Sequence, residues 1–503
     1  MSADRRRPAL SALVALAIGL AVPDPASAHA IDGAFQLPVP LWLYLLGAAV
    51  AVGASFVVTA LATRSAAEPD YPTIAVPAAV DTGLRVLLRA IGVAWWYGAI
   101  VVGFVVADIS PFPAVLLWVG VWVALPIAAA VAGNPWPSLS PFRTTFAALE
   151  WVARRSGLER LDAGLPYPPA LARWPVVVLL VAGVWCELIL PGSSLATAVA
   201  ALMAGYTVLT LGGVTLFGPV AWLRNAELFE VLLGWFGRIG PVARRSVSRE
   251  VCARCGEACR PDRCFDCPEC AVAAEDGERR ADLRTWFVGL TEPAPPGWSD
   301  AVFIVLVLAG VTYDGMRETA FGATLLEWLL TPITGALGVT SLAFLLTDTA
   351  ALALVVAAFL TAFATILALT RVIARGSRMR PAAYASTLLP IAAGYLIAHY
   401  LTLVVRAAIW LPSLLVDPLM SLAPDVSWIP VGAIWYLSVA AIVGGHIAGI
   451  VLAHRLALRD APERATLAGL PMVALMIGYT VLSLWIIAQP IVVEPGVPPA
   501  AMR

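Results

Sequence analysis

Residues 346–370 read LTDTAALALVVAAFLTAFATILALT, an apolar run in which Asp348 is the charged residue. About 20 apolar residues in a helix are enough to cross the ~30 Å hydrocarbon core of a membrane. The whole chain shares this character, because 60% of its 503 residues are hydrophobic and 13% are charged, against roughly a quarter charged in soluble domains. The sequence therefore predicts an all-α, polytopic integral membrane protein in contact with the lipid bilayer.

An export signal precedes ten runs of this kind. It has a basic start (Arg5–Arg7), the apolar stretch SALVALAIGLAV and the small-residue segment PDPASAHA, which fits cleavage after Ala28 or after Ala30. We expect a signal peptide at 1–28, five spans within 29–217, a loop at 218–298 and five spans within 299–503. The predicted spans are 41–63, 86–107, 113–132, 174–192, 194–217, 299–316, 346–370, 383–408, 428–455 and 467–489.

The arginines predict how these spans are oriented. All 32 basic residues are arginine, and the formal net charge is −1. Short cytoplasmic loops collect basic residues, and with an exported mature N-terminus only Arg317, Arg406 and Arg503 of the mature chain fall outside. This distribution predicts a bacterial inner-membrane protein with both termini outside and the 218–298 loop in the cytosol. The balanced charge argues against a nucleic-acid partner, which needs a clustered basic surface.

Two further apolar segments are not predicted to cross. Ala320–Leu346 contains Glu327 and Pro332, and a crossing there would move Arg371–Arg380 to the outside. We therefore expect an interfacial or re-entrant segment. Trp222–Phe236 is predicted to be an amphipathic helix on the inner surface.

Six cysteines occur in the predicted cytosolic loop, in CARCGEACRPDRCFDCPECA at residues 252–271. Cytosolic thiols stay reduced, and paired Cys-x-x-Cys spacings suit a tetrahedral Zn²⁺ held by thiolates. One zinc ion, two zinc ions with shared thiolates and an iron–sulfur cluster are the alternatives, although the spacing differs from the ferredoxin run. A closed zinc site would fold a small loop domain, which in turn offers a docking surface for a cytosolic protein. The candidate ligands are Cys252, Cys255, Cys259, Cys264, Cys267 and Cys270.

Ionisable side chains within the spans are a second set of candidates. Each costs about 2.5–3.5 kcal/mol at the centre of a spanning helix, so its presence at depth indicates a function. Asp314 in VTYDGMRE and His399 in YLIAHYL lie toward the outer ends of their spans, as do Glu187 and Asp348. We expect an outward-facing polar pocket suited to metal binding or acid–base work. The alternative is a set of satisfied hydrogen bonds between helices. The candidate catalytic residues are His399, Asp314 and His446.

The segment GGHIAGIVLAH at 444–454 surrounds His446 with small residues. Gly444, Gly445 and Gly449 predict the close approach of a neighbouring helix. His446 and His454 are separated by about 12 Å along the helix axis, too far to share one metal ion. His454 is expected at the inner boundary, where a snorkelling or surface role is one interpretation.

Several segments resemble a known family. They are HAIDGAFQLPVPLWLYLLGAAV at 29–50, NPWPSLSPFR at 134–143, VTYDG at 311–315, AHY at 398–400 and GGHIAGIVLAH. With them the chain resembles the bacterial polytopic membrane proteins that bear the name fenitrothion hydrolase. The resemblance implies a membrane-embedded hydrolase of organophosphate esters that uses His399, Asp314 and His446. The cysteine cluster is not part of the family pattern.

Three functions therefore follow from the sequence. The first is an ester hydrolase with an intramembrane His/Asp site and a small-molecule substrate. The second is a transporter or channel for a metal ion or small solute, in which the zinc-binding loop is regulatory. The third is a subunit for assembly or electron transfer. No HExxH, GxSxG or dinucleotide-binding glycine pattern occurs, so the common soluble hydrolase and oxidoreductase signatures are absent.

The arginine distribution leads to a labelling prediction. Single cysteines placed at Ser193 and Ser377 should respond differently to a membrane-impermeant thiol reagent applied to intact cells. The reagent should label position 193 from outside and leave position 377 unlabelled, because the latter falls among cytosolic arginines. The reverse pattern would contradict the predicted topology.

The cysteine spacing leads to a metal prediction. Purified protein should contain one or two zinc ions per chain by elemental analysis. Cys252→Ser combined with Cys270→Ser should remove them while the membrane domain stays folded, because the ligands lie in one loop. Protein without metal, or with the visible absorption of an iron–sulfur cluster, would refute the zinc interpretation.

Overall fold

The computed structural model of the chain describes residues 35–63, 71–248, 250–251, 268–275, 277–291, 297–375, 379–419 and 422–493. The protein is 78% helical with few strands, which confirms the all-α class. Among the described residues, ten helices are long and apolar enough to cross a membrane. The polytopic helical bundle predicted from the sequence is thus confirmed.

The predicted spans correspond to long helices or to helices joined end to end. The third span is α4 (Phe112–Ala114), the π-helix η2 (Val115–Ala124) and α5 (Leu125–Ala132), and the eighth is α17 (Pro381–Ser386) with α18 (Leu389–Val416). The others are α2 (Leu41–Ala62), α3 (Ala78–Val105), α8 (Trp174–Leu188), α9 (Ala196–Phe217), α14 (Trp298–Arg317), α16 (Ser341–Ala374), α19 (Val431–Asp460) and α20 (Ala465–Ile491).

Shorter helices join or accompany the spans. Proline is the first residue of α7 at Pro141, of α10 at Pro219, of α13 at Pro268 and of the joined helix α17 at Pro381, positions where its missing N–H costs no hydrogen bond. The shorter helices are α6 (Trp136–Leu139), α7 (Pro141–Arg155), α10 (Pro219–Ala226), α11 (Leu228–Gly237), α13 (Pro268–Ala273) and α15 (Ala320–Leu337).

Helix α8 has 15 residues, which is short for a span, but it covers the same depth as α14. Arg173, just before α8, pairs with Asp300 near the start of α14 at 2.5 Å. At the other end, Arg317 of α14 donates a hydrogen bond to the carbonyl oxygen of Leu188 at 2.6 Å. The two helices therefore run parallel between the same two levels, which agrees with the predicted span at 174–192.

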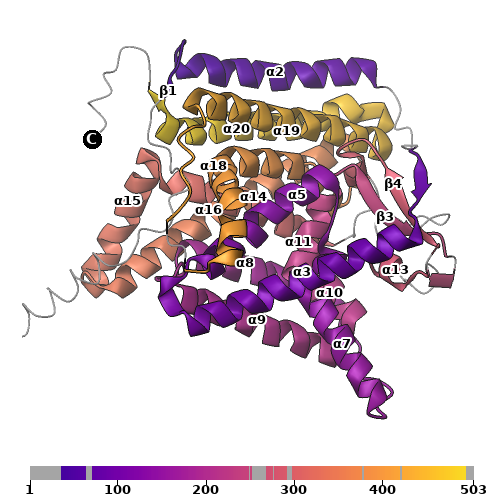
Figure 1. The fold of residues 1–503 in the computed structure, drawn as a ribbon. Helices are drawn as coiled ribbons and strands as arrows, with labels where there is room; N and C mark the ends of the chain where they lie inside the picture. Colours follow the sequence, from indigo (N-terminus) through magenta and orange to yellow (C-terminus); the bar gives the residue numbers. More distant parts are fainter. Residues whose placement is uncertain are drawn as a thin grey trace, which may run out of the picture.

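Helix α15 has the length and composition of a span, but both of its ends lie on one side of the bundle. Tyr313, near the end of α14, donates a hydrogen bond to the carbonyl oxygen of Asp348 in α16 at 3.1 Å. Ser341, where α16 begins, is about 10 Å from Asp348 at 1.5 Å per residue, so it lies near the level where α14 ends. Figure 1 shows α15 across the ends of its neighbours. This geometry agrees with the predicted interfacial segment.

The spans are stacked in layers, as Figure 1 shows, with α2 at one edge, α19 and α20 next, and α3 and α9 at the opposite edge.

Helices α18 and α19 cross closely because glycines of each helix face the backbone of the other. A Cβ at Gly394 or at Gly445 would lie 2.3 Å from a carbonyl oxygen of the other helix. At Gly449 a Cβ would lie 2.7 Å from the carbonyl oxygen of Thr387, whereas Gly444 faces open space. The predicted close approach is confirmed at Gly445 and Gly449 and is wrong at Gly444.

The structure contradicts the surface helix predicted for Trp222–Phe236. The segment forms α10 and α11, which fold back along α9. Trp222 lies against Gly213, and Tyr206 of α9 hydrogen-bonds to Glu227 between the two short helices. Tyr206 lies about 16 Å along α9 from its end at Phe217, so the turn between α10 and α11 is deep inside the bundle.

The prediction failed because α11 is apolar around most of its circumference, with Glu230 as its charged residue. All of its residues except Gly234 are buried, and a helix that is apolar all round is a buried helix rather than an amphipathic one. Glu227 and Glu230 give the segment its amphipathic appearance, but both side chains find polar partners inside the protein.

Both ends of α11 are capped by buried charged side chains. Glu227 accepts hydrogen bonds from two backbone N–H groups of the first turn. Arg284, which is 4% exposed, donates to the carbonyl oxygens of Gly237 and Gly240 at 3.0 Å each. The negative group at the N-terminus and the positive group beyond the C-terminus match the helix dipole, and they satisfy backbone groups that burial would otherwise leave unpaired.

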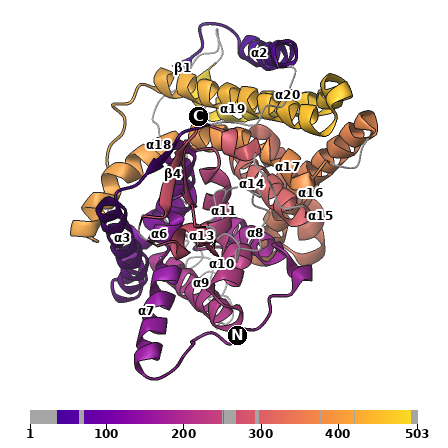
Figure 2. The same ribbon diagram turned by 90° about the vertical axis from the view of Figure 1, so that its right-hand side faces the viewer.

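A small antiparallel sheet covers the end of the bundle at which α9 finishes. Its strand order is β2 (Thr73–Ala75), β4 (Arg279–Leu283) and β3 (Val242–Ser246). Figure 2 faces this end and shows β4 and α13 in front of the bundle. Segments from the predicted cytosolic loops thus meet at one end of the molecule.

The opposite end carries the first and last described elements. Strand β1 (Phe35–Gln36) pairs in parallel with β5 (Val492–Val493). Figure 1 shows β1 at the end away from β3 and β4. The chain before the first span and the chain after the last one are therefore on the same side, as an even number of crossings requires.

Candidate functional site

The structure brings Asp314 and His399 together. Nε2 of His399, on α18, lies 2.9 Å from Oδ2 of Asp314, on α14. The hydroxyl of Tyr400 donates a hydrogen bond to the same oxygen at 2.5 Å. His399 is 2% exposed. The carboxylate therefore holds the imidazole in one orientation, as acid–base chemistry by histidine requires.

Two neighbours of the pair support the imidazole. Tyr395 precedes His399 by one turn, and the two rings stack with centroids 5.7 Å apart. Gly315 makes room for this tyrosine, because a Cβ there would lie 2.2 Å from its hydroxyl oxygen. The Asp-Gly pair in VTYDG thus places a carboxylate next to the space that the supporting ring occupies.

A small cavity connects Asp314 with Glu187 of α8. Its volume is about 50 Å³, and most of its wall is apolar, contributed by η2, α5, α8, α11, α14 and α18. Trp122 of η2 also lines the cavity. A water needs roughly 10–15 Å³ of such space, whereas pockets for drug-sized ligands measure about 300–1,000 Å³. The cavity admits a few waters, a proton or a small cation.

Asp348, which the sequence places at a similar depth, does not line this cavity. Its carbonyl oxygen accepts the hydrogen bond from Tyr313 described above. The cavity therefore contains two of the predicted carboxylates, Asp314 and Glu187, and not the third.

His446 lies elsewhere in the bundle. Its Nδ1 is 2.8 Å from the carbonyl oxygen of Ile442, and the residue has no exposed surface. Ser438 is the α19 residue beside His399, since it hydrogen-bonds to the carbonyl oxygen of Ala398. His446 is about 12 Å further along the same helix. The structure thus brings together two of the three predicted catalytic residues.

His454 is buried, and the predicted snorkelling or surface role is wrong. The residue is 1% exposed because α2 covers it. Its Nε2 lies 3.4 Å from the carbonyl oxygen of Thr63, and its ring meets Phe56 edge-on at 5.8 Å.

The predicted zinc site falls largely outside the described residues. Cys270 is described, and it is buried in α13 at 2% exposure. Within the described part of the chain, no three His, Cys, Asp or Glu side chains are grouped as metal ligands. Zinc binding therefore stays a prediction. The predicted ligands that lie outside the described residues are Cys252, Cys255, Cys259, Cys264 and Cys267.

Glu227 is a buried carboxylate that is not among the site residues predicted from the sequence. Its Oε1 accepts hydrogen bonds from the Tyr206 hydroxyl at 2.6 Å and from the N–H of Phe229 at 3.0 Å. Its Oε2 accepts from the Trp136 indole at 2.8 Å and from the N–H of Glu230 at 2.7 Å. Four donors satisfy a carboxylate that has no exposed surface.

A buried ion pair lies one turn away. Arg143 and Glu230 are 3.2 Å apart, with side chains 10% and 4% exposed. The signal for these groups is present in the sequence, since NPWPSLSPFR contains Trp136 and Arg143, and two glutamates are three residues apart in an otherwise apolar segment. The aromatic rings that enclose them are Trp96, Trp136, Phe142, Tyr206 and Phe229.

Comparison with protein-family models, with curated proteins and with solved structures found no match for this chain.

The role of Glu227 leads to a stability prediction. Glu227→Ala should lower the free energy of unfolding by more than about 2 kcal/mol, because it removes a helix cap and takes away the acceptor of the Tyr206 O–H and of the Trp136 indole N–H. Thermal unfolding in detergent, followed by size-exclusion chromatography, measures the change. Glu150→Ala is the control, since its ion pair with Arg154 on α7 is worth only about 0.2–0.5 kcal/mol. Equal Tm values for the two variants would contradict the capping role.

Proposed function

We propose that this chain is a membrane transport protein that binds and moves protons at Asp314, His399 and Glu187. The observation that carries the proposal is the cavity of about 50 Å³ that Asp314 and Glu187 share inside a helical bundle. Ionisable groups at membrane depth that face a hydrated space are typical of proton relays in pumps and transporters.

The chemistry of the three groups supports this function. Two carboxylates facing one apolar cavity repel each other when both are ionised, so a proton or small cation between them is stabilised. His399 contacts Asp314, and an imidazole has two ring nitrogens, of which one can accept a proton while the other donates one. The site can therefore hold a proton in more than one place, which transfer between groups requires.

The helices around the cavity support transport as well. Leu232 and Phe236 of α11 form part of the wall, so a re-entrant helix lies against the site. Broken or re-entrant helices beside binding sites are common in transporters, and π-helical turns such as η2 often occur at functional sites. Trp122 comes from that π-helix.

The arginine distribution supports a location in a bacterial inner membrane, with the β2–β4–β3 sheet in the cytosol and both termini outside. The signal peptide, at residues 1–28 and outside the described residues, is removed after Ala28 or Ala30. Zinc bound by the six cysteines folds the segment between β3 and β4 into a regulatory or docking element for a cytosolic protein.

A second candidate is the organophosphate ester hydrolase that the family resemblance implies. The observation that favours it is the His399–Asp314 contact, because a carboxylate that orients an imidazole is a common general-base arrangement. The size of the cavity argues against this candidate, since about 50 Å³ has no room for an aryl phosphotriester.

Proton flux into liposomes tests the proposal. Purified protein is reconstituted with a trapped pH-sensitive dye, and a membrane potential, negative inside, is imposed by potassium and valinomycin. The wild type should acidify the interior. Asp314→Asn should slow acidification at least roughly tenfold, because proton transfer groups contribute about 10²–10⁴-fold to rates. Asp425→Asn, in the exposed turn before α19, is the control and should match the wild type.

His399→Gln separates a chemical role from a packing role at the same site. Glutamine keeps a hydrogen bond to Asp314 but does not titrate, so the variant should keep its Tm and lose proton flux. Retention of both would mean that His399 only packs between helices. Hydrolysis of a nitrophenyl phosphotriester by vesicles that show no proton flux would favour the hydrolase and overturn the transport proposal.

A further inference from the structure

A larger cavity, of about 370 Å³, lies at the sheet end of the molecule, far from Asp314. Its wall comes from the first turns of α3, from residues 132–138, and from β3, β4 and α13. Its volume is within the range of small-molecule binding sites. It is distinct from the transport site, with which it shares no lining residue.

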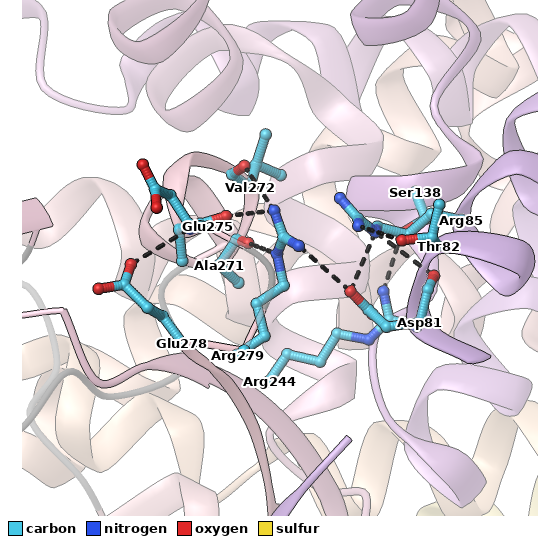
Figure 3. A network of polar contacts seen from close by, with 12 residues as sticks. Asp81, Thr82, Arg85, Ser138, Arg244, Ala271, Val272, Glu275, Glu278 and Arg279 are labelled. Atoms are coloured by element: carbon cyan, nitrogen blue, oxygen red, sulfur yellow. Dashed lines mark hydrogen bonds and ion pairs between the residues drawn. The ribbon is translucent and has the colours of Figure 1, made fainter. Parts of the chain in front are cut away.

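Four arginines line this cavity, and three of them, Arg85, Arg244 and Arg279, come from three different elements near one carboxylate, as Figure 3 shows. Asp81 of α3 pairs with Arg85 at 3.1 Å and with Arg279 of β4 at 3.4 Å. Arg244 of β3 donates a hydrogen bond to the hydroxyl of Ser138 at 2.8 Å. Cationic side chains thus outnumber the carboxylate in a partly enclosed space.

The pKa of Arg244 is lowered by its surroundings in the cavity. Burial lowers the pKa of its guanidinium, Asp81 raises that pKa, and the nearby charges of Arg85 and Arg279 lower it again. An anion in the cavity would relieve this repulsion. Guanidinium groups bind phosphate oxygens with two parallel hydrogen bonds, which suits a phosphate group better than a simple halide.

The part of the cavity wall that α3 contributes includes exposed apolar side chains. Val80 and Leu84 line the cavity and are 59% and 43% exposed, and Leu87, one turn further, is 56% exposed. Exposed apolar residues on a spanning helix face lipid. A basic cavity that continues into a lipid-facing stripe matches an amphiphile with an anionic head and an apolar tail.

We infer that this cavity binds the phosphate group of an anionic phospholipid, with Arg85, Arg244 and Arg279 around the phosphate and the acyl chain along Val80 and Leu84. Basic pockets at the cytoplasmic side of spanning helices bind anionic headgroups in this way. The same phosphate chemistry fits free phosphate, which lacks the tail that the α3 stripe would contact.

Lipid-dependent thermal stability of the full chain in detergent tests the inference. Phosphatidylglycerol should raise the Tm of the wild type, whereas phosphatidylcholine, which carries no net charge, should not. Arg244→Gln should need roughly five- to tenfold more phosphatidylglycerol for half of the shift, since one arginine contact near the headgroup is lost. Arg154→Gln, at a 63% exposed arginine of α7, is the charge-matched control and should behave as the wild type.

A second pair of variants keeps the test independent of the Arg244 side chain. Val80→Glu places a negative charge in the exposed part of the cavity wall and should weaken the rise in Tm that phosphatidylglycerol causes. Val80→Gln, in which the new side chain has the size of glutamate but no charge, should not weaken it. If inorganic phosphate alone stabilises the wild type and Arg244→Gln loses that effect, the cavity binds phosphate. This result would overturn the inference that the phosphate belongs to a lipid. Equal responses of the wild type, Arg244→Gln and Val80→Glu would overturn the site itself.

Discussion

Inside a bilayer the backbone has no water to bond with, so every N–H and C=O group must find a partner within the protein. A span meets this requirement by itself, but a turn at membrane depth does not. The turn between α10 and α11 is possible because Glu227 satisfies the N-terminal groups of α11 and Arg284 satisfies its C-terminal carbonyls. Helix α11 in turn supplies the wall of the cavity at Asp314. The polar cap and the candidate site therefore depend on the same buried helix.

The buried carboxylates of this bundle fall into two classes by their surroundings. Glu227 accepts four hydrogen bonds, two on each oxygen, and lines neither described cavity, so its charge stabilises structure. Asp314 accepts from His399 and Tyr400 through one oxygen and faces a cavity that Glu187 shares. A carboxylate next to space and to an imidazole can exchange a proton, whereas a fully bonded one cannot do so without breaking its cap.

The two ends of the molecule differ in chemistry. Around Asp314 the cavity wall is apolar apart from two carboxylates and the Tyr400 hydroxyl, with His399 in contact with Asp314 and Arg317 one turn further along α14. At the sheet end, arginines from α3, β3 and β4 surround Asp81, which suits an anion. The strands that carry Arg244 and Arg279 pair with each other and lie on either side of the cysteine-rich segment in the sequence.

The sequence by itself indicated the spanning helices, because a long apolar run can satisfy all of its backbone groups in lipid by forming a helix. It also identified Asp314 and His399 as candidate site residues, since an ionisable side chain inside the membrane costs free energy wherever it lies. Only the tertiary structure decided that these two side chains meet while His446 does not, because helix period sets the face of a residue but not its neighbour across the bundle. It likewise decided that Glu227 lies inside, since the four donors that stabilise it come from α9, α6 and α11, and no local pattern encodes that convergence.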